Sequence, residues 1–165
     1  MTATTRISGC LLAAVALTLL PRCVAKTESA SCTLLGCGPA LRVDLLREAW
    51  EPGDYQIDVT ADGVATSCTV SLPLSSCSNL VHCDRADPGF FVETSGCALP
   101  AAQQEIPGIV WPTSGPSNVT VKVQQDGVLL GSGSFQPTYN TSQPNGEGCE
   151  PTCSQSDLQA TIDLP

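Results

Sequence analysis

Histidine, aromatic and basic residues are all scarce in this 165-residue sequence. Its one histidine, His82, is accompanied by no G-x-S-x-G turn, and a serine or cysteine nucleophile needs a base to activate it. We therefore expect no catalytic residues and no enzyme activity. Seven Lys and Arg stand against sixteen Asp and Glu, so the formal net charge is −9. Such a chain repels phosphate backbones, which argues against nucleic-acid partners.

Long apolar runs are also lacking. The run Leu11–Leu20 is ten residues long, whereas a membrane-spanning helix needs about 20. A basic residue precedes this run and Pro21 ends it, as in a secretory signal peptide. Small residues at Cys23 and Ala25 favour cleavage after Ala25. This interpretation makes residues 1–25 a signal peptide.

The leader has a second interpretation, as the signal of a bacterial lipoprotein. The signal then ends at Arg22, and Cys23 carries the lipid, although Arg22 stands where a small residue is usual. Both interpretations export the chain to the extracellular space, the periplasm or the outer cell surface. They differ in membrane contact, which we expect only through a lipid anchor at Cys23.

Cysteine is the abundant residue in this chain. Two of its ten cysteines fall in the leader, and the other eight lie beyond it. An even set of eight behind an export signal predicts up to four disulfides. The candidates are Cys32, Cys37, Cys68, Cys77, Cys83, Cys97, Cys149 and Cys153. We expect the local pairs Cys32–Cys37, Cys68–Cys77, Cys83–Cys97 and Cys149–Cys153. Alternatively, Cys149 and Cys153 each reach a distant partner and pin the C-terminal strand.

Metal and cofactor sites are not expected. The first two and the last two of these eight cysteines have a spacing that would suit zinc, but exported thiols oxidise. A calcium site is no better supported, because Asp84 and Asp87 suit capping and turn roles. Asp62 is best explained as a turn residue, since Gly63 follows it.

Apolar and polar residues alternate along much of the chain beyond residue 40, which is typical of strands with one buried face. The alternation is clearest at Tyr55–Thr60, and Asp62-Gly63 separates this run from Val64–Leu72. An Asp-Gly pair between such runs predicts a hairpin, because both turn residues tolerate positive φ.

The same pattern recurs around Asp126-Gly127, between residues 119–124 and 128–135. Both copies read V-x-x-D-G-V. An internal duplication would explain this, but we favour a common hairpin solution used twice. Further strands are expected at 41–45, 90–94, 106–111 and 158–164, although the first of these also fits a helix turn.

Thirteen prolines and fourteen glycines separate these short runs, and no segment predicts a helix of three turns. The fold class is therefore all-β. We expect an antiparallel β-sandwich of immunoglobulin-like architecture, stapled by disulfides, over residues 40–165. Residues 26–39 form a lead-in segment before this single domain.

The few aromatic side chains are candidates for a carbohydrate-binding platform on a sheet face. They are Trp50, Trp111 and one of Phe90 and Phe91, since neighbouring strand residues point to opposite faces. For each of them, packing in the core is the interpretation that we favour.

Two segments resemble exported, cysteine-rich bacterial β-domain proteins. One is QPNGEGCEPTC, from Gln143 to Cys153. The other is EPGDY, from Glu51 to Tyr55, which leads into the first Asp-Gly hairpin and Cys68. The resemblance implies a bacterial cell-envelope origin and one β domain. It implies no site residues, because such proteins have no established activity to carry over.

The sequence thus favours a non-enzymatic module, secreted or lipid-anchored, that binds a protein or a cell-surface polymer or serves as structure. Two alternatives stay open. One is a small hydrolase or protease inhibitor that works from the loop between Cys77 and Cys97. The other is a carbohydrate-binding module.

Overall fold

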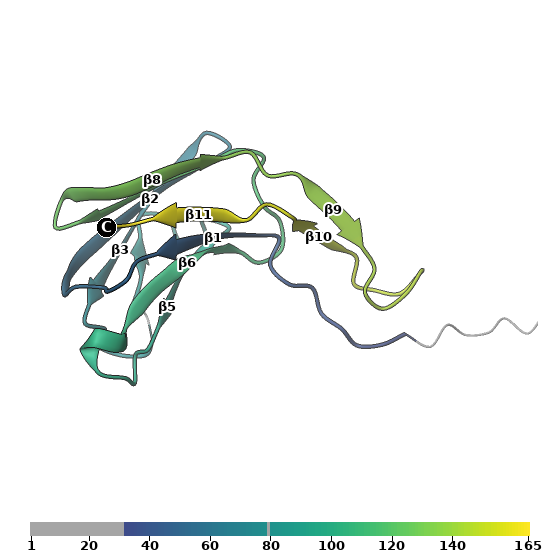
Figure 1. Cartoon of the computed structure of the whole chain (residues 1–165). Helices are drawn as coiled ribbons and strands as arrows, with labels where there is room; N and C mark the ends of the chain where they lie inside the picture. The colour runs from purple at the N-terminus through teal and green to yellow at the C-terminus, as the bar shows by residue number, and fades with distance from the viewer. Residues whose placement is uncertain (1–31, 79) are drawn as a thin grey trace, which may run out of the picture.

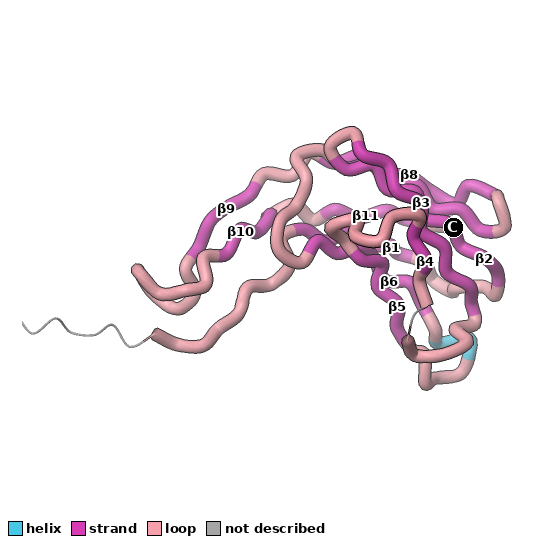
Figure 2. The backbone as a smooth tube through the Cα atoms, turned by 180° about the vertical axis from the view of Figure 1, so that it is seen from behind, coloured by secondary structure: helices cyan, strands magenta, loops and turns pink. Residues whose placement is uncertain are grey.

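The computed structural model describes residues 32–78 and 80–165. The predicted leader, its cleavage site after Ala25 and the lipidation candidate Cys23 lie outside the described residues. Strands dominate the described chain, and its one helical segment is a short 3-10 turn at Ala101–Gln103 (Figure 2). The all-β prediction is therefore confirmed.

The larger sheet is antiparallel throughout and contains both Asp-Gly hairpins. The two hairpins lie side by side because their first strands pair with each other. In spatial order its strands are β4 (His82–Cys83), β3 (Val64–Leu72), β2 (Gly53–Ala61), β7 (Val119–Gln125) and β8 (Val128–Phe135).

The second sheet has four strands and departs from the expected antiparallel pattern. Its spatial order is β11 (Ala160–Asp163), β1 (Leu41–Leu46), β6 (Glu105–Trp111) and β5 (Phe91–Ser95). Strands β1 and β11 pair in parallel. The reason is topological: Ser156 N donates to Ala40 O at 2.8 Å, so the chain returns to the starting end of β1 just before β11 begins.

One hydrophobic core fills the space between the two sheets. Side chains at alternate positions of facing strands belong to a single buried cluster, as the period-two pattern predicts. The cluster includes Tyr55, Ile57 and Val59 of β2, Val119, Val121 and Val123 of β7, Leu41, Val43 and Leu45 of β1, and Ile106 and Ile109 of β6.

The aspartate of each Asp-Gly turn also accepts hydrogen bonds from the backbone at the start of the other hairpin. Asp62 and Asp126 both adopt positive φ, at 47° and 50°. The Asp62 carboxylate accepts hydrogen bonds from Asn118 N at 2.8 Å and Ser117 N at 3.2 Å, just before β7. The Asp126 carboxylate accepts a hydrogen bond from Asp54 N at 2.9 Å, near the start of β2. The repeated sequence pattern is therefore a repeated structural device.

A third, two-stranded sheet extends away from the two larger ones. It pairs β9 (Tyr139–Ser142) with β10 (Cys153–Ser156), and residues 32–39 run beside it without forming a strand (Figures 1 and 2). We refer to residues 32–39 and 139–156 together as the arm. The C-terminus lies at the far end of the molecule from the arm (Figure 1).

All eight cysteines beyond the leader form disulfides, but the four predicted local pairs are wrong. The structure instead pairs Cys32–Cys149, Cys37–Cys153, Cys68–Cys83 and Cys77–Cys97. The alternative, in which Cys149 and Cys153 reach distant partners, is the arrangement found. Cys32–Cys149 and Cys37–Cys153 both join the same two segments, because residues 32–39 run beside the β9–β10 ribbon.

Candidate functional site

The most distinctive hollow of the described surface lies between β4 and β5, the end strands of the two large sheets. Its volume is about 360 Å³, which falls in the range of small-ligand sites. Its lining combines two basic side chains with apolar ones, and includes Val81, His82, Arg85, Pro88, Phe91 and Val92. We call it the β4–β5 hollow.

Disulfides fix the walls of the β4–β5 hollow. Strand β4 has only two residues, but Cys68–Cys83 joins it covalently to β3 at directly paired positions. Asp84 extends this attachment, because its N–H donates to Ser67 O at 3.0 Å and its carboxylate accepts from Ser67 N at 3.1 Å. Cys77–Cys97 closes the loop that carries the hollow. Little conformational freedom is left to lose on binding.

Arg85 is an unpaired cation in this hollow. Its two acidic neighbours are engaged elsewhere: the carboxylate of Asp84 caps Ser67, and that of Asp87 accepts from Gly89 N at 3.3 Å. Both therefore have the capping and turn roles expected of them. Within the described residues, Arg85 forms no ion pair.

Phe91 forms the exposed apolar wall. Its ring is 48% exposed, whereas neighbouring Phe90 is 7% exposed and stacks in the core against Trp111, with centroids 5.3 Å apart. Phe91 pairs in register with Val110, which is buried on the outer face of β6. The two Phe thus point to opposite faces, as predicted, and Phe91 is the outward one.

His82 lies at the rim of the hollow and is exposed. In the described part of the chain its ring nitrogens form no hydrogen bond, while its backbone pairs with Thr69 of β3 and its carbonyl accepts from Thr69 Oγ1 at 3.4 Å. The arrangement offers an imidazole that can donate to a ligand. It does not present a nucleophile already hydrogen-bonded to a base.

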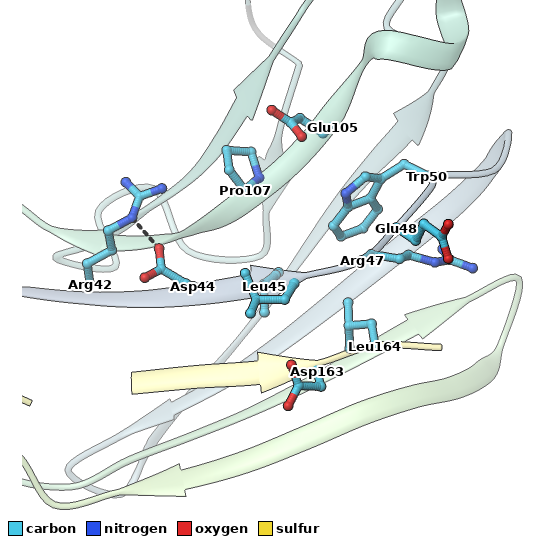
Figure 3. Close-up of a pocket in the computed structure, with 11 residues that line it drawn as sticks. Arg42, Asp44, Leu45, Arg47, Glu48, Trp50, Glu105, Pro107, Asp163 and Leu164 are labelled. Atoms are coloured by element: carbon cyan, nitrogen blue, oxygen red, sulfur yellow. Dashed lines mark hydrogen bonds and ion pairs between the residues drawn. The ribbon is translucent and has the colours of Figure 1, made fainter. Parts of the chain in front are cut away.

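A second, larger groove of about 500 Å³ opens near the C-terminal end of the molecule (Figure 3). Glu105 and Pro107 of β6 line one side, and Trp50 lines the other (Figure 3). Arg42, at one end, forms ion pairs with Asp44 at 2.5 Å and Glu93 at 2.6 Å. The hydrogen bond to Asp44 raises the pKa of Arg42 above its usual value.

The other cation of this groove, Arg47, is also engaged internally. It donates to Tyr55 Oη at 2.8 Å, to Gln125 Oε1 at 3.1 Å and to the backbone carbonyl of Pro165 at 2.9 Å. Its guanidinium also lies over the ring of Trp50, 5.7 Å from the centroid. Arg47 therefore braces the C-terminus, and the remaining charges that face the groove are acidic.

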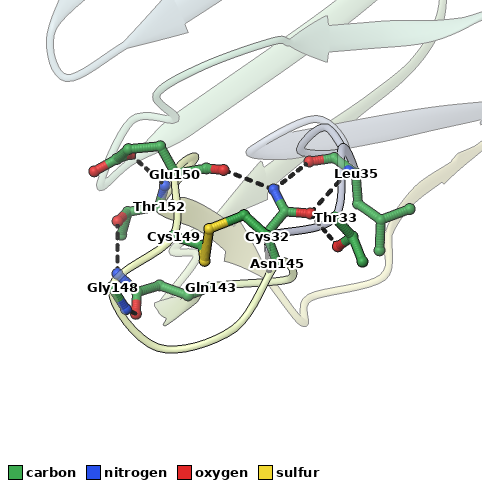
Figure 4. Close-up of a disulfide and its surroundings, with 9 residues drawn as sticks. All are labelled: Cys32, Thr33, Leu35, Gln143, Asn145, Gly148, Cys149, Glu150 and Thr152. Carbon is green, nitrogen blue, oxygen red and sulfur yellow. Dashed lines mark hydrogen bonds between the residues drawn. A yellow bond between two sulfur atoms is a disulfide. The ribbon is translucent and has the colours of Figure 1, made fainter. Parts of the chain in front are cut away.

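The arm carries a built-in polar cluster around Asn145, which is 7% exposed (Figure 4). Its Oδ1 accepts from Thr33 Oγ1 at 2.6 Å and Leu35 N at 2.8 Å. Its Nδ2 donates to Leu35 O at 3.0 Å and Glu150 O at 2.7 Å. Every hydrogen-bonding position of the amide is used, so Asn145 holds the arm together beside Cys32–Cys149.

The other predicted sites have structural explanations. Trp50 and Trp111 are 8% and 3% exposed, so the favoured core role is confirmed for both and for Phe90. Asp62 is a turn residue, as expected. Within residues 32–78 and 80–165, no three His, Cys, Asp or Glu side chains gather so as to hold a metal ion.

Arg85 was not among the residues predicted from the sequence to form a site. A signal was present, because Arg85 is a lone basic residue between Asp84 and Asp87 in a strongly acidic chain. Its importance depends on which N–H donors those two carboxylates bind, and this emerges only from the folded loop.

Comparisons with known proteins add no relatives: no family model, no curated protein and no solved structure matches this chain. In the described part of the chain, no helix has the length and apolar character needed to cross a membrane. The function must therefore be inferred from the site itself.

Proposed function

We propose that this protein is an exported, non-enzymatic binding module of the bacterial cell envelope or exterior. It is secreted, or anchored through a lipid on Cys23, and it binds a protein or a cell-surface polymer at the β4–β5 hollow. One observation carries the proposal: an unpaired guanidinium, that of Arg85, and an exposed aromatic ring, that of Phe91, line a hollow whose walls are fixed by disulfides.

Two features support the scaffold part of the proposal. Two sheets around one core are the arrangement of a β-sandwich, and we describe its architecture as immunoglobulin-like. Four disulfides are consistent with an oxidising compartment, where such bonds persist. The export leader predicted from residues 1–25 agrees with this location.

The composition of the hollow supports binding over catalysis. Recognition needs fixed donors and apolar surface, and Arg85, His82 and Phe91 supply both. Aromatic residues and arginine are also the side chains most often found where binding energy concentrates.

The second candidate function uses the same region of the chain. Cys77–Cys97 closes a loop whose tip, residues 84–87, is exposed, and a rigid exposed loop of this kind is what many protease inhibitors present. An inhibitor would titrate a protease without turnover. A hydrolase would show turnover that the substitution His82→Ala abolishes.

The experiment measures binding of the labelled mature protein to intact cells and cell-wall fractions of its own host. We expect saturable binding that the substitutions Arg85→Gln and Phe91→Ser each weaken about tenfold or more. Lys122→Gln is the matched control, because Lys122 is an exposed cation on β7 that also lacks an ion pair in the described residues. Binding that is unsaturable, or equal in all four proteins, would contradict the proposal, as would turnover lost in the His82→Ala variant.

A further inference from the structure

We infer that the β4–β5 hollow recognises a carboxylate joined to an aromatic or branched aliphatic group. This inference rests on the proposed function and names the ligand chemistry of the same site. A free aryl or alkyl carboxylic acid has this chemistry, and so does the C-terminus of a peptide that ends in an apolar residue.

The charge of the site selects an anion. The described residues contain fifteen acidic side chains and four basic ones, so a free cationic spot is unusual on this surface. Two of those four cations, Arg42 and Arg47, are satisfied internally. Arg85 is not, and the imidazole of His82 lines the same hollow as a second donor.

The geometry of guanidinium favours a carboxylate among anions. Arginine presents parallel N–H donors that match the two oxygens of a carboxylate, and the resulting bidentate pair fixes orientation as well as affinity. Neither neighbouring acid competes for Arg85, because Asp84 and Asp87 accept backbone N–H groups instead.

The rest of the lining is apolar and selects the group attached to that carboxylate. Phe91 offers a half-exposed ring face, while Val81 and Pro88 contribute further apolar surface. A volume of about 360 Å³ holds one aromatic or branched side chain with its carboxylate. Stacking on Phe91 would supply the apolar part of the binding energy.

The larger groove near the C-terminus makes a useful contrast. It too is lined by an aromatic residue, Trp50, but that ring is 8% exposed and lies under Arg47. Arg42 is ion-paired and Arg47 is held by internal hydrogen bonds, while Glu48, Glu105 and Asp163 line the groove. An anion would be repelled there, so the inference is specific to the β4–β5 hollow.

The experiment titrates the oxidised mature protein with 3-phenylpropionate and with its neutral amide, followed by amide chemical shifts. We expect the carboxylate to shift the amides of residues 81–92 in a saturable way and to bind about tenfold or more tightly than the amide. Arg85→Gln should remove most of that preference. Phe91→Ser should weaken the carboxylate about tenfold, and Lys122→Gln should leave the titration unchanged.

A second arm of the experiment separates the two ligand sources. A short peptide ending in Phe is compared with the same peptide amidated at its C-terminus. A free-acid peptide that binds more tightly than 3-phenylpropionate would support a peptide terminus as the natural ligand. Equal affinities would support a small acid.

Two results would overturn the inference. One is equal affinity for carboxylate and amide, and the other is unchanged carboxylate binding by the Arg85→Gln variant. If either occurs while saturable binding to host cells persists, the ligand chemistry is wrong and the binding function stands. If cell binding is also lacking, the proposed function fails as well.

Discussion

Asp62 and Asp126 each combine a left-handed turn conformation with hydrogen bonds to the opposite hairpin. The turn and the contact depend on the same side chain, because aspartate both tolerates positive φ and offers acceptor oxygens. The two residues therefore fasten the central β2–β7 pair at both of its ends.

The first prediction concerns the substitution Asp62→Ala. It should lower the free energy of unfolding by about 1–3 kcal/mol, because it removes two acceptors of backbone N–H groups and because alanine tolerates positive φ less well than aspartate. Asp126→Ala should cost less, since Asp126 accepts one such bond. Denaturant unfolding under non-reducing conditions measures both values.

The control for this comparison is Asp58→Ala. Asp58 lies on β2, the strand that leads into the Asp62 turn, and its side chain accepts a hydrogen bond from the exposed side chain of Gln56, at 2.9 Å. Its replacement should change stability by no more than about 0.5 kcal/mol. A loss equal to that of Asp62→Ala would show that general charge removal, and not the turn contact, is responsible.

Tyr55 gives a pH prediction. Its burial raises the pKa of the phenol above the ordinary value of 10.0, and the neighbouring Arg47 opposes this shift only in part. Because the folded state holds the proton more tightly than the unfolded state, stability is full below pH 10 and falls as the pH rises through the folded pKa. Burial raises the pKa of Tyr139 as well, so both contribute to the same alkaline loss.

The substitution Tyr55→Phe tests this account. It should lower stability at pH 8, because the hydroxyl that donates to Glu51 O at 2.7 Å is lost. It should also flatten the decline of the unfolding free energy above pH 10, because one titrating group is removed. Denaturant titrations from pH 8 to pH 11 measure both effects, and an unchanged alkaline slope would contradict the assignment.

Among single residues, the buried ones were the most predictable from the sequence. Period-two alternation identified Tyr55, Ile57 and Val59 because a strand in a two-sheet protein has one apolar face. The outward position of Phe91 required only that one of two adjacent aromatic residues face away from the core. The hollow was not predictable, since Arg85 becomes a site only through the engagement of its acidic neighbours by loop backbone.

At the scale of elements, apolar alternation identified the long strands and missed the polar ones. Strands β9 and β10 read YNTS and CSQS, without an alternating apolar face. Apart from Tyr139, which packs against the core, they are held by disulfides and by the buried amide of Asn145. A two-stranded ribbon without such fastening is marginally stable in water.

The predicted disulfide pairing was wrong because the elements that decide it also lack an alternating apolar pattern. Local pairs follow from sequence spacing, but Cys68 faces Cys83 because a two-residue strand pairs with β3. So short a strand gives no periodic signal. Cys149 and Cys153 meet the N-terminal segment because the ribbon returns beside it, which only the complete topology establishes.

The contribution of each arm disulfide should depend on whether the other one is present. In the loop-closure description, Cys32–Cys149 alone closes a loop with a sequence separation of 117, worth about 5 kcal/mol. Once Cys32–Cys149 is formed, Cys37–Cys153 closes only the small ring that runs from Cys32 to Cys37 and from Cys149 to Cys153. This ring has about nine residues, and closing it is worth about 3 kcal/mol or less. The stabilising contributions of the two disulfides are therefore not additive. Whichever disulfide remains after the other is removed still supplies most of the restriction of the unfolded chain.

The test compares two variants by denaturant unfolding without reductant. Removing Cys37–Cys153 with paired serines should cost about 3 kcal/mol or less, and removing Cys32–Cys149 as well should cost about 5 kcal/mol more. Hydrogen exchange should show that the first loss is concentrated in the arm. Equal costs for the two steps would contradict the parallel arrangement of the bridges.

At the scale of the whole molecule, the two sides of the paired sheets differ. On one side β8 and β11 approach closely: a Cβ at Gly131 would lie 2.7 Å from Leu164 Cδ2, and one at Gly133 would lie 3.0 Å from Ile162 Cγ1. On the other side β4 and β5 leave the hollow open. Binding is proposed at the open side, where the chain places a free cation and an exposed ring.

This asymmetry depends on covalent bonds. Strand β4 and the loop after it would have few attachments without Cys68–Cys83 and Cys77–Cys97. Within the arm, likewise, two disulfides and the Asn145 cluster join residues 32–39 to residues 139–156. The fold, the arm and the hollow therefore all rest on the disulfide arrangement.

Mass spectrometry of unreduced peptides, from protein recovered from its host and alkylated at once, determines this pairing. We predict four cross-linked peptide pairs, joining Cys32 to Cys149, Cys37 to Cys153, Cys68 to Cys83 and Cys77 to Cys97, with no alkylated thiol among these eight cysteines. Free thiols at these positions, or the local pairs Cys32–Cys37 and Cys149–Cys153, would contradict the account.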